Sequence, residues 1–276
     1  MKVIELTKAD FNRLDEVSSV ERGTMGNYTY VDDAWNYYWN TEGSFLVAEK
    51  DDQIVGIAHL AVLPDSAGWF EALRVLPEYQ NQGVGKALYK KAIELCTERY
   101  HCVSLSMYTG RRNVRSVALV QRFGLVNEYE HLEYNFDVIS SASRGTFRNI
   151  NWQRAQEIAV PLCEEYGGFV SINRTWYRIN EPNIRMMADK GYFYEDEDGN
   201  MVCLGTRFQH DKKLFVLMFK GDYRKGLEFA VNLAYARNIP TLTCTFVSSN
   251  RKLEQALKNY GFTPVGEMIT RERIFG

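Results

Sequence analysis

The chain has 276 residues, of which 45% are hydrophobic and 25% charged, and its formal net charge is −2. This near-neutral balance gives no broad basic surface, so we expect neither a nucleic-acid partner nor binding to an anionic membrane. No apolar run approaches the roughly 20 residues of a membrane helix, so no membrane span is expected.

The start of the chain and the cysteines bear on the compartment. The opening "MKVIELTKAD" has no long apolar core, so it does not read as a signal peptide. The five cysteines are scattered and form no C-x-x-C pair, a pattern typical of reduced thiols in a cytoplasmic protein. The four histidines also lie far apart, without metal-ligand spacing, so we expect no metal site.

The first half of the chain alternates between predicted strands and helices. The strand "KVIELT" precedes two helices, "ADFNRLDEVSS" and "YVDDAWNYYWN". A hairpin is predicted in "SFLVAEKDDQIVGIAHLAVL" and a strand in "AGWFEALRV". Next come the amphipathic helix "GKALYKKAIELCTERY", the strand "CVSLSMYT", the helix "NVRSVALVQRF" ending at Gly124, and the strand "LVNEYEHLEYNFDVI".

The small and polar run "SSASRG", residues 140–145, predicts a domain boundary, with one domain at 1–140 and a second at 145–276. The second half starts the pattern again and repeats one spacing, since Asn113 to Gly124 and Asn250 to Gly261 both run eleven residues and end before an apolar residue. We therefore expect an α+β fold built from two copies of one unit.

The stretch "LRVLPEYQNQGVGKAL", residues 73–88, predicts a strand, a glycine-containing loop and the first turn of a helix. Such a turn leaves backbone N–H groups unpaired at the positive end of the helix dipole, which suits a phosphate. A dinucleotide fingerprint would need a third glycine where Leu88 stands, and a P-loop would need Ser or Thr where Ala87 stands. A simple structural turn remains the alternative.

The loop resembles the acetyl-CoA signature of the GNAT superfamily of N-acetyltransferases, [Q/R]-x-x-G-x-[G/A], which Gln80, Gly83 and Gly85 fill. The Asn-led helix "NVRSVALVQRFGL" resembles that superfamily's next element. The resemblance covers about the first 140 residues and implies two tandem GNAT-like units, each with a mixed, mostly antiparallel sheet flanked by helices. The second unit lacks the pyrophosphate loop.

The resemblance implies acetyl-CoA as the acetyl donor and a set of residues that bind it. The loop amides would grip the pyrophosphate, the strand end would pair with the pantetheine arm, and an Asn at position 113 commonly contacts the cofactor. The residues carried over are Leu73, Arg74, Val75, Gln80, Asn81, Gln82, Gly83, Val84, Gly85, Lys86 and Asn113.

Two features depart from the superfamily pattern. The tyrosine that often protonates the leaving thiolate is replaced by Val120, so either another group donates the proton or the thiolate leaves unaided. Tyr108, at the end of a predicted strand, is the candidate donor. The loop also carries neither Arg nor Lys before Lys86, so phosphate binding would depend mainly on backbone amides.

Glu71 is the candidate general base, because the attacking amine must first lose a proton and some GNAT enzymes place an acid at this position. By strand alternation it shares a face with Trp69 and Leu73. The alternative is an ordinary solvated or ion-paired strand carboxylate. His59, in an apolar strand, is expected to be a hydrogen-bonded core residue rather than a base.

The aromatic segment 24–40 has two interpretations. Its tyrosines and tryptophans, together with Asp32 and Asp33, would suit a cationic amine, or they pack a helix onto the sheet. The acceptor itself stays open: a small-molecule amine or a peptide amine fits, while the weak basicity of the cleft argues against a strongly acidic acceptor. The sequence leaves the oligomeric state open.

The expected function is transfer of an acetyl group from acetyl-CoA to an amine by direct attack, with a backbone N–H near residues 73–75 stabilising the oxyanion. The alternative is a CoA-binding sensor or interaction module without catalysis. In the second copy only "KGDY" separates strand from helix, and Asp222 would place a negative charge where a pyrophosphate would lie, so one acetyl-CoA per chain is expected.

Overall fold

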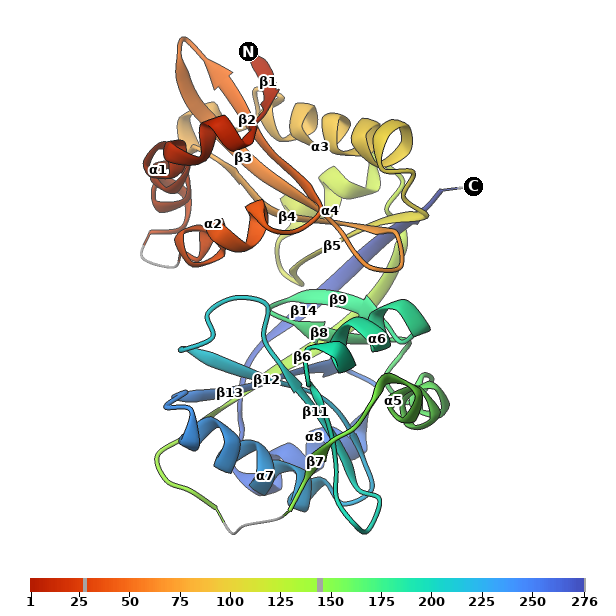
Figure 1. The fold of residues 1–276 in the computed structure, drawn as a ribbon. Coiled ribbons are helices and arrows are strands. Elements are labelled where there is room, and N and C mark those ends of the chain that lie inside the picture. The colour runs from red at the N-terminus through yellow and green to blue at the C-terminus, as the bar shows by residue number, and fades with distance from the viewer. Residues whose placement is uncertain (27–28, 143–145, 276) are drawn as a thin grey trace. The chain divides into compact units, whose positions relative to one another are not determined.

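A computed structural model describes residues 1–26, 29–142 and 146–275, which form two compact units (Figure 1). Unit 1 comprises Met1–Tyr108, Asn113–Asn127 and Arg271–Gly276, and unit 2 comprises Thr109–Arg112 and Glu128–Thr270. These compact units follow a different partition from the predicted domains 1–140 and 145–276. Residues 143–145 of the predicted linker lie outside the described residues, and that boundary stays a prediction.

Unit 1 is a mostly antiparallel sheet flanked by helices, as predicted. Its strands are ordered β1-β2-β3-β4-β5, and only the β4–β5 pair is parallel. The elements are β1 (Lys2–Glu5), α1 (Leu14–Met25), α2 (Val31–Trp39), β2 (Gly43–Lys50), β3 (Gln53–Val62), β4 (Ala67–Val75), α3 (Val84–Glu94), β5 (Ser104–Gly110) and α4 (Val114–Gln121).

The two faces of β3 carry different helices. A Cβ added at Gly56 would lie 2.7 Å from Val84 and 3.3 Å from Leu88, so this face of the strand packs against α3. On the opposite face His59 stacks on Tyr38 of α2, with ring centroids 3.9 Å apart. Side chains alternate along a strand, so helices cover both faces of the sheet here.

A β-bulge interrupts β4. Ile57 of β3 pairs with Arg74, and His59 pairs with Glu71, so two residues of β4 lie opposite one of β3. Ala72 accommodates the extra residue with a φ of 55°, in the left-handed region that non-glycine residues rarely adopt. After the bulge, each side chain of β4 therefore points to the face of the sheet opposite to the one that simple alternation gives.

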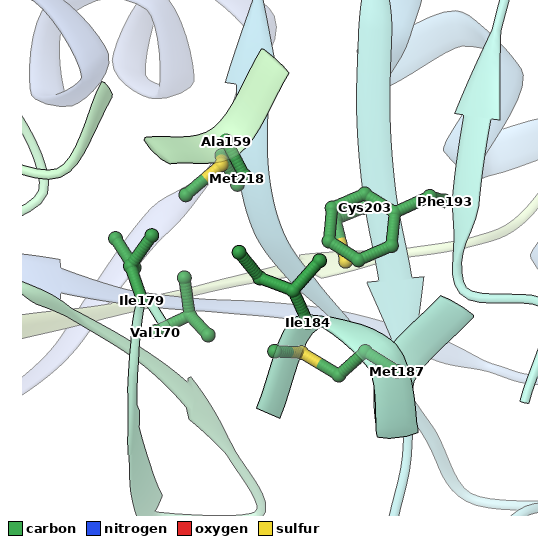
Figure 2. A pocket seen from close by; sticks show the side chains of 8 residues that line it. All are labelled: Ala159, Val170, Ile179, Ile184, Met187, Phe193, Cys203 and Met218. Carbon is green, nitrogen blue, oxygen red and sulfur yellow. The ribbon is translucent and has the colours of Figure 1, made fainter. Parts of the chain in front are cut away.

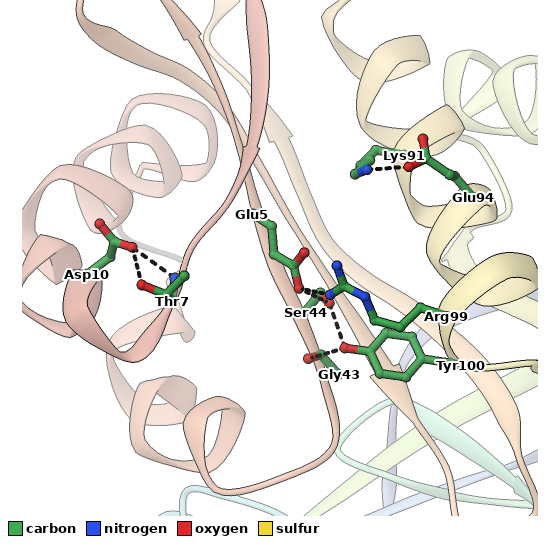
Figure 3. A network of polar contacts seen from close by, with 9 residues as sticks. All are labelled: Glu5, Thr7, Asp10, Gly43, Ser44, Lys91, Glu94, Arg99 and Tyr100. Carbon is green, nitrogen blue, oxygen red and sulfur yellow. Dashed lines mark hydrogen bonds and ion pairs between the residues drawn. The ribbon is translucent and has the colours of Figure 1, made fainter.

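A polar network joins the end of α3 to the first strands (Figure 3). The chain leaves α3 through a π-helical turn, Leu95–Arg99, and Tyr100 then donates its hydroxyl to the carbonyl of Gly43 at 2.8 Å. Ser44 donates to Glu5 at 2.7 Å, and Arg99 forms an ion pair with the same carboxylate. These bonds fix the C-terminal end of α3 against β1 and β2.

Unit 2 has a sheet ordered β14-β6-β13-β12-β11-β10-β7 and a separate β8–β9 hairpin. The second series of strands and helices, predicted for the second half of the chain, is present. The β8–β9 hairpin, α6 and β14 were not predicted. The elements are β6 (Asn127–Asp137), β7 (Arg148–Asn149), α5 (Trp152–Ala159), β8 (Phe169–Ile172), β9 (Thr175–Arg178), α6 (Glu181–Asp189), β10 (Phe193–Glu195), β11 (Met201–Gly205), β12 (Lys213–Lys220), α7 (Tyr223–Ala236), β13 (Thr241–Val247), α8 (Arg251–Tyr260) and β14 (Thr263–Ile274).

His131 of β6 is a buried polar residue of unit 2. Its Nδ1 accepts a hydrogen bond from the indole N–H of Trp176 at 3.1 Å, and its Nε2 lies 3.1 Å from the hydroxyl of Thr270. Because an indole only donates, Nδ1 carries no proton and Nε2–H donates to Thr270. Burial lowers the pKa of His131 to about 3.

This histidine predicts a loss of stability in mild acid. Between its folded pKa and the unfolded value of about 6.5, only the unfolded chain binds the proton, so the free energy of unfolding falls as pH drops below about 6.5. We expect this group to remove about 2 kcal/mol between pH 7 and pH 5. Denaturant titrations at both pH values should show a smaller loss in His131→Gln, whereas the exposed control His210→Gln should match the wild type. An equal loss in all three proteins would contradict the assignment.

Candidate active site

The N-terminus of α3 is open. Its first helical hydrogen bond runs from the N–H of Ala87 to the carbonyl of Gly83 at 2.9 Å, so the N–H groups of residues 84–86 precede the hydrogen-bond ladder of the helix. Within the described part of the chain, no side chain caps this end. The N–H groups and the helix dipole together suit an anion.

Several other helices of the chain close the same position with an Asn or Asp side chain. Asn113 caps α4 by accepting the N–H of Ser116 at 3.1 Å, and Asn250 caps α8 by accepting that of Leu253 at 3.1 Å. α5 and α6 are capped in the same way by Asn151 and Asn180. The asparagine that marks the sequence repeat is therefore an N-cap in both copies, and its cofactor contact stays a prediction.

The loop before α3 is held by its own side chains. Gln80 donates to the carbonyl of Val75 at 3.1 Å and accepts from Arg115 at 3.1 Å, which fixes the loop to the end of β4. Gln82 donates to a loop carbonyl at 2.7 Å. Asn81 and Gly83 both adopt the left-handed conformation, with φ of 61° and 84°. Nothing lies within 4 Å of the position a Cβ would take at Gly83, so the backbone there is approachable.

The β4–β5 pair opens beside this helix end. Its parallel register comprises Ala67–Ser104, Gly68–Leu105 and Trp69–Ser106, although β4 continues to Val75 and β5 to Gly110. Past Trp69 the register of β4 with β5 gives no further pair among the described residues. The sequence-predicted residues 73–75 lie on this diverging part of β4.

Glu71 lies at the start of the bulge and is buried, with 6% of its surface exposed. Its carboxylate lies 3.1 Å from Nδ1 of His59, which is itself 1% exposed and stacked on Tyr38. The expectation that His59 is a hydrogen-bonded core residue is confirmed, but its partner is the predicted catalytic carboxylate. Sequence reasoning treated the two residues separately because nothing local shows that they face each other across β3 and β4.

The bulge corrects the predicted face of β4. Trp69 and Glu71 do share a face, since they pair with alternate residues of β3. Leu73 does not, because the extra residue Ala72 turns it toward the core on the α3 side, and Arg74 takes its place beside Glu71. The prediction from simple alternation was therefore wrong for Leu73.

Tyr108, Val120 and the aromatic segment, which the sequence also singled out, lie in different surroundings. Tyr108 of β5 is half-buried and its ring stacks on Trp69, with centroids 6.4 Å apart. Val120 is fully buried in the core, and its apolar side chain cannot donate a proton. Trp35 of the aromatic segment packs on Phe45 and donates to the carbonyl of Phe11, so this part of the segment packs the sheet. Residues 27 and 28 of that segment lie outside the described residues.

The corresponding helix start in unit 2 is closed. Only Gly221 and Asp222 separate β12 from α7, whereas residues 76–83 separate β4 from α3. As predicted, Asp222 places its carboxylate on the helix end, where it accepts the N–H groups of Arg224 at 2.8 Å and Lys225 at 3.3 Å.

The strand end in unit 2 is also occupied. The register of β12 with β13 runs to Val216–Cys244, while β12 continues to Lys220. The buried hydroxyl of Tyr166 accepts the N–H of Phe219 at 2.8 Å and donates to its carbonyl at 3.3 Å. A Cβ on the next residue, Gly167, would lie 3.1 Å from Val247 of β13. This segment therefore fills the space beside the strand end.

A small cavity in unit 2 has no matching chemistry (Figure 2). It measures about 10 Å³, roughly the smallest volume that holds one water molecule. Its lining is apolar apart from one thiol and consists of Ala159, Val170, Ile179, Ile184, Met187, Phe193, Cys203 and Met218. It is a packing defect of the core rather than a ligand site.

Comparison with known proteins agrees with the open helix end and the diverging strands of unit 1. Residues 12–125 match the model of the acetyltransferase (GNAT) family. Over these residues the chain is similar to the GNAT acetyltransferase family. The match covers the loop, α3 and α4.

Two curated relatives carry N-acetyltransferase names. The chain is 30% identical over 86 residues, 31% of its length, to a Bacillus subtilis protein described as a candidate alanine N-acetyltransferase for ribosomal protein bS18, and spans 56% of it. It is 25% identical over 142 residues, 51% of its length, to a histidine N-acetyltransferase of Xenopus tropicalis, and spans 44% of it. The chain thus spans about half the length of the curated relatives it matches.

Solved structures extend the fold similarity to the whole chain. A candidate acetyltransferase from Pyrococcus horikoshii aligns with 100% of this chain and 89% of its own, with a TM-score of 0.68 and 13% identity. A tandem GNAT protein from the clavulanic acid biosynthesis pathway aligns over 100% and 98%, with a TM-score of 0.65 and 12% identity. The chain therefore has the tandem GNAT fold, with two GNAT-like units.

The described residues include neither a membrane-spanning helix nor a cluster of metal-binding side chains. None of the helices in ranges 1–26, 29–142 and 146–275 is both long and apolar enough to cross a membrane. The same ranges hold no group of three or more His, Cys, Asp or Glu side chains that could bind a metal ion.

The shared asparagine caps predict matched stability losses. Asn113→Ala and Asn250→Ala each remove one side-chain acceptor from a helix start, so each should lower the free energy of unfolding by about 1 kcal/mol. Denaturant titration of both variants measures this, and Asn113→Asp and Asn250→Asp should retain most of the stability. A destabilisation by Asn250→Ala alone would mean that Asn113 does not act as a cap.

Proposed function

We propose that the chain is an acetyl-CoA-dependent N-acetyltransferase whose single active site lies in unit 1. The observation that carries this proposal is the uncapped N-terminus of α3 beside the diverging end of β4. A helix end suited to an anion, next to strand backbone with which β5 does not pair, fits a guest that carries both phosphates and amides. The match of residues 12–125 to the GNAT family model and the N-acetyltransferase names of the curated relatives support it.

In this proposal backbone groups bind the donor. The amides of residues 81–86 contact the pyrophosphate, and the backbone of residues 73–75 pairs with the pantetheine arm. The loop presents exposed backbone at Asn81, Gln82 and Gly83, and its shape is fixed by the Gln80 bonds described above. Such preorganised positioning of the thioester supplies the entropic part of catalysis.

Glu71 takes the proton from the attacking amine, directly or through a water molecule. Its hydrogen bond to His59 orients the carboxylate and offers a second group over which the proton is shared. A backbone N–H near residues 73–75 stabilises the oxyanion. Tyr108 is the proposed proton donor to the thiolate, since Val120 provides none, and its half-buried position across the diverging strands supports this role.

Unit 2 binds no acetyl-CoA in this proposal, because Asp222 repels phosphate at the helix end and Tyr166 takes up the strand backbone.

The second candidate is a CoA-binding sensor or interaction module without catalysis. The observation that favours it is Val120, which lies in the core where the superfamily often has its tyrosine acid. Release of free thiol from acetyl-CoA in the presence of an amine panel separates the two functions.

The role of Glu71 predicts a selective loss of rate. Glu71→Gln keeps the size and the hydrogen-bonding oxygen but cannot accept a proton, so kcat should fall by roughly 10²- to 10⁴-fold, while the affinity for acetyl-CoA stays nearly unchanged. Thiol release and calorimetry measure the two effects. The exposed control Glu98→Gln should behave as wild type. A fully active Glu71→Gln enzyme would leave Glu71 a structural carboxylate.

The binding site predicts one acetyl-CoA per chain. Gly83→Asn keeps a residue that tolerates the left-handed conformation but puts a side chain where the phosphates approach, so calorimetric stoichiometry should fall from near one to zero. Gly168→Asn is the matched control in unit 2, because Gly168 has the same φ of 84° and the same open surroundings. Binding of acetyl-CoA by Gly83→Asn would contradict the assignment of the loop.

A further inference from the structure

Arg74 lies beside Glu71 because of the Ala72 bulge. Arg74 pairs with Ile57 and Glu71 pairs with His59, and these two residues of β3 point to the same face of the strand. The bulge therefore places a guanidinium and the proposed base on the same face of the sheet, the face on which Tyr38 packs.

The guanidinium is buried but only partly bonded. The side chain is 15% exposed, and its Nη1 donates to the carbonyl of Leu73 at 3.0 Å. Its carbon lies 5.7 Å from the centre of the Tyr30 ring. Its Nε is buried and has no hydrogen-bond partner among the described residues. An arginine has five N–H donors, and most of those of Arg74 make no hydrogen bond to the described residues.

Glu21 is a neighbour of Arg74 but an incomplete counter-ion. Its Oε1 lies 3.7 Å from Nη2, too far for a hydrogen bond, while its Oε2 accepts the N–H groups of Tyr30 and Val31 at 3.0 and 2.8 Å. Burial raises the pKa of Glu21. Burial acts to lower the pKa of Arg74, but Tyr30, Tyr108 and Glu21 raise it overall, so the guanidinium stays charged.

The surroundings of Arg74 are those of the proposed active site. Arg74 lies on the same face of β4 as Glu71, and its guanidinium carbon lies 5.7 Å from the centre of the Tyr30 ring. A buried, charged and incompletely bonded arginine in such a place matches a carboxylate, which accepts two parallel N–H bonds from the guanidinium.

We propose that Arg74 binds a carboxylate of the acceptor, so that the acceptor is an amine that also carries an acid group, such as an amino acid. This inference depends on the proposed function. It differs from the expectation, drawn from sequence, that a strongly acidic acceptor is disfavoured. That expectation relied on the weak basicity of the cleft, to which the structure adds the buried guanidinium of Arg74.

The test compares matched acceptors. Free amino acids and the corresponding amino acid amides differ only in the carboxylate, and thiol release with product mass spectrometry gives kcat/KM for each pair. Wild type should prefer the acids, and Arg74→Gln should lower the ratio of acid to amide by about 10- to 100-fold, mainly through KM. Arg74→Lys keeps the charge beside Glu21 and should show an intermediate ratio, which provides the test if the Gln variant does not fold. Arg22→Gln, on the exposed surface of α1, should leave the ratio unchanged.

The outcomes separate the two proposals. A wild type that acetylates amides or polyamines as well as it acetylates acids, or an Arg74→Gln variant with an unchanged ratio, would overturn the role of Arg74 and leave the N-acetyltransferase proposal standing. Acetyl-CoA binding without turnover of any amine would instead overturn catalysis itself, and with it the role of Arg74.

Discussion

In β4, Ala72 and Leu73 lie together opposite a single residue of β3, and the faces on which Glu71 and Arg74 lie depend on this extra residue. Without it, Leu73 would share a face with Glu71 and Arg74 would point into the apolar core. With it, a carboxylate and a guanidinium stand on one face while Leu73 completes the packing against α3. The left-handed backbone of Ala72 is the local strain that the surrounding sheet sustains.

The backbone groups at the strand end and the helix start have different hydrogen-bond partners in the two units. Where parallel strands diverge, the N–H and C=O groups at the strand end need a partner. In unit 2 the chain supplies that partner as the Tyr166 hydroxyl, and it caps the neighbouring helix with Asp222. In unit 1 the helix is left without a side-chain cap. Unit 1 is thus distinguished from unit 2 by the helix N-terminus that it leaves without a side-chain cap.

Much of this could be predicted from the sequence, because its signals are local. The strand, the loop with Gly83 and the helix after it follow from periodicity and turn residues, as does Asp222 at the shorter connection. The bulge could not be predicted, since an alanine in the left-handed region has no sequence signature. The Glu71–His59 pair and the Tyr166 contact join residues far apart in sequence, and no spacing rule reports such contacts. The repeated asparagine was visible, but its capping role needed coordinates.

Unit 1 includes Arg271–Gly276 although residues 128–270 belong almost entirely to unit 2. The N–H of Phe275 donates to the carbonyl of Val103 at 2.9 Å, and Arg273 donates to that of Phe123 at 3.0 Å. During synthesis on the ribosome, unit 1 therefore stays incomplete until the whole of unit 2 has been translated. Closing so long a loop carries an entropic cost and slows folding, so the order of folding need not follow the order of translation.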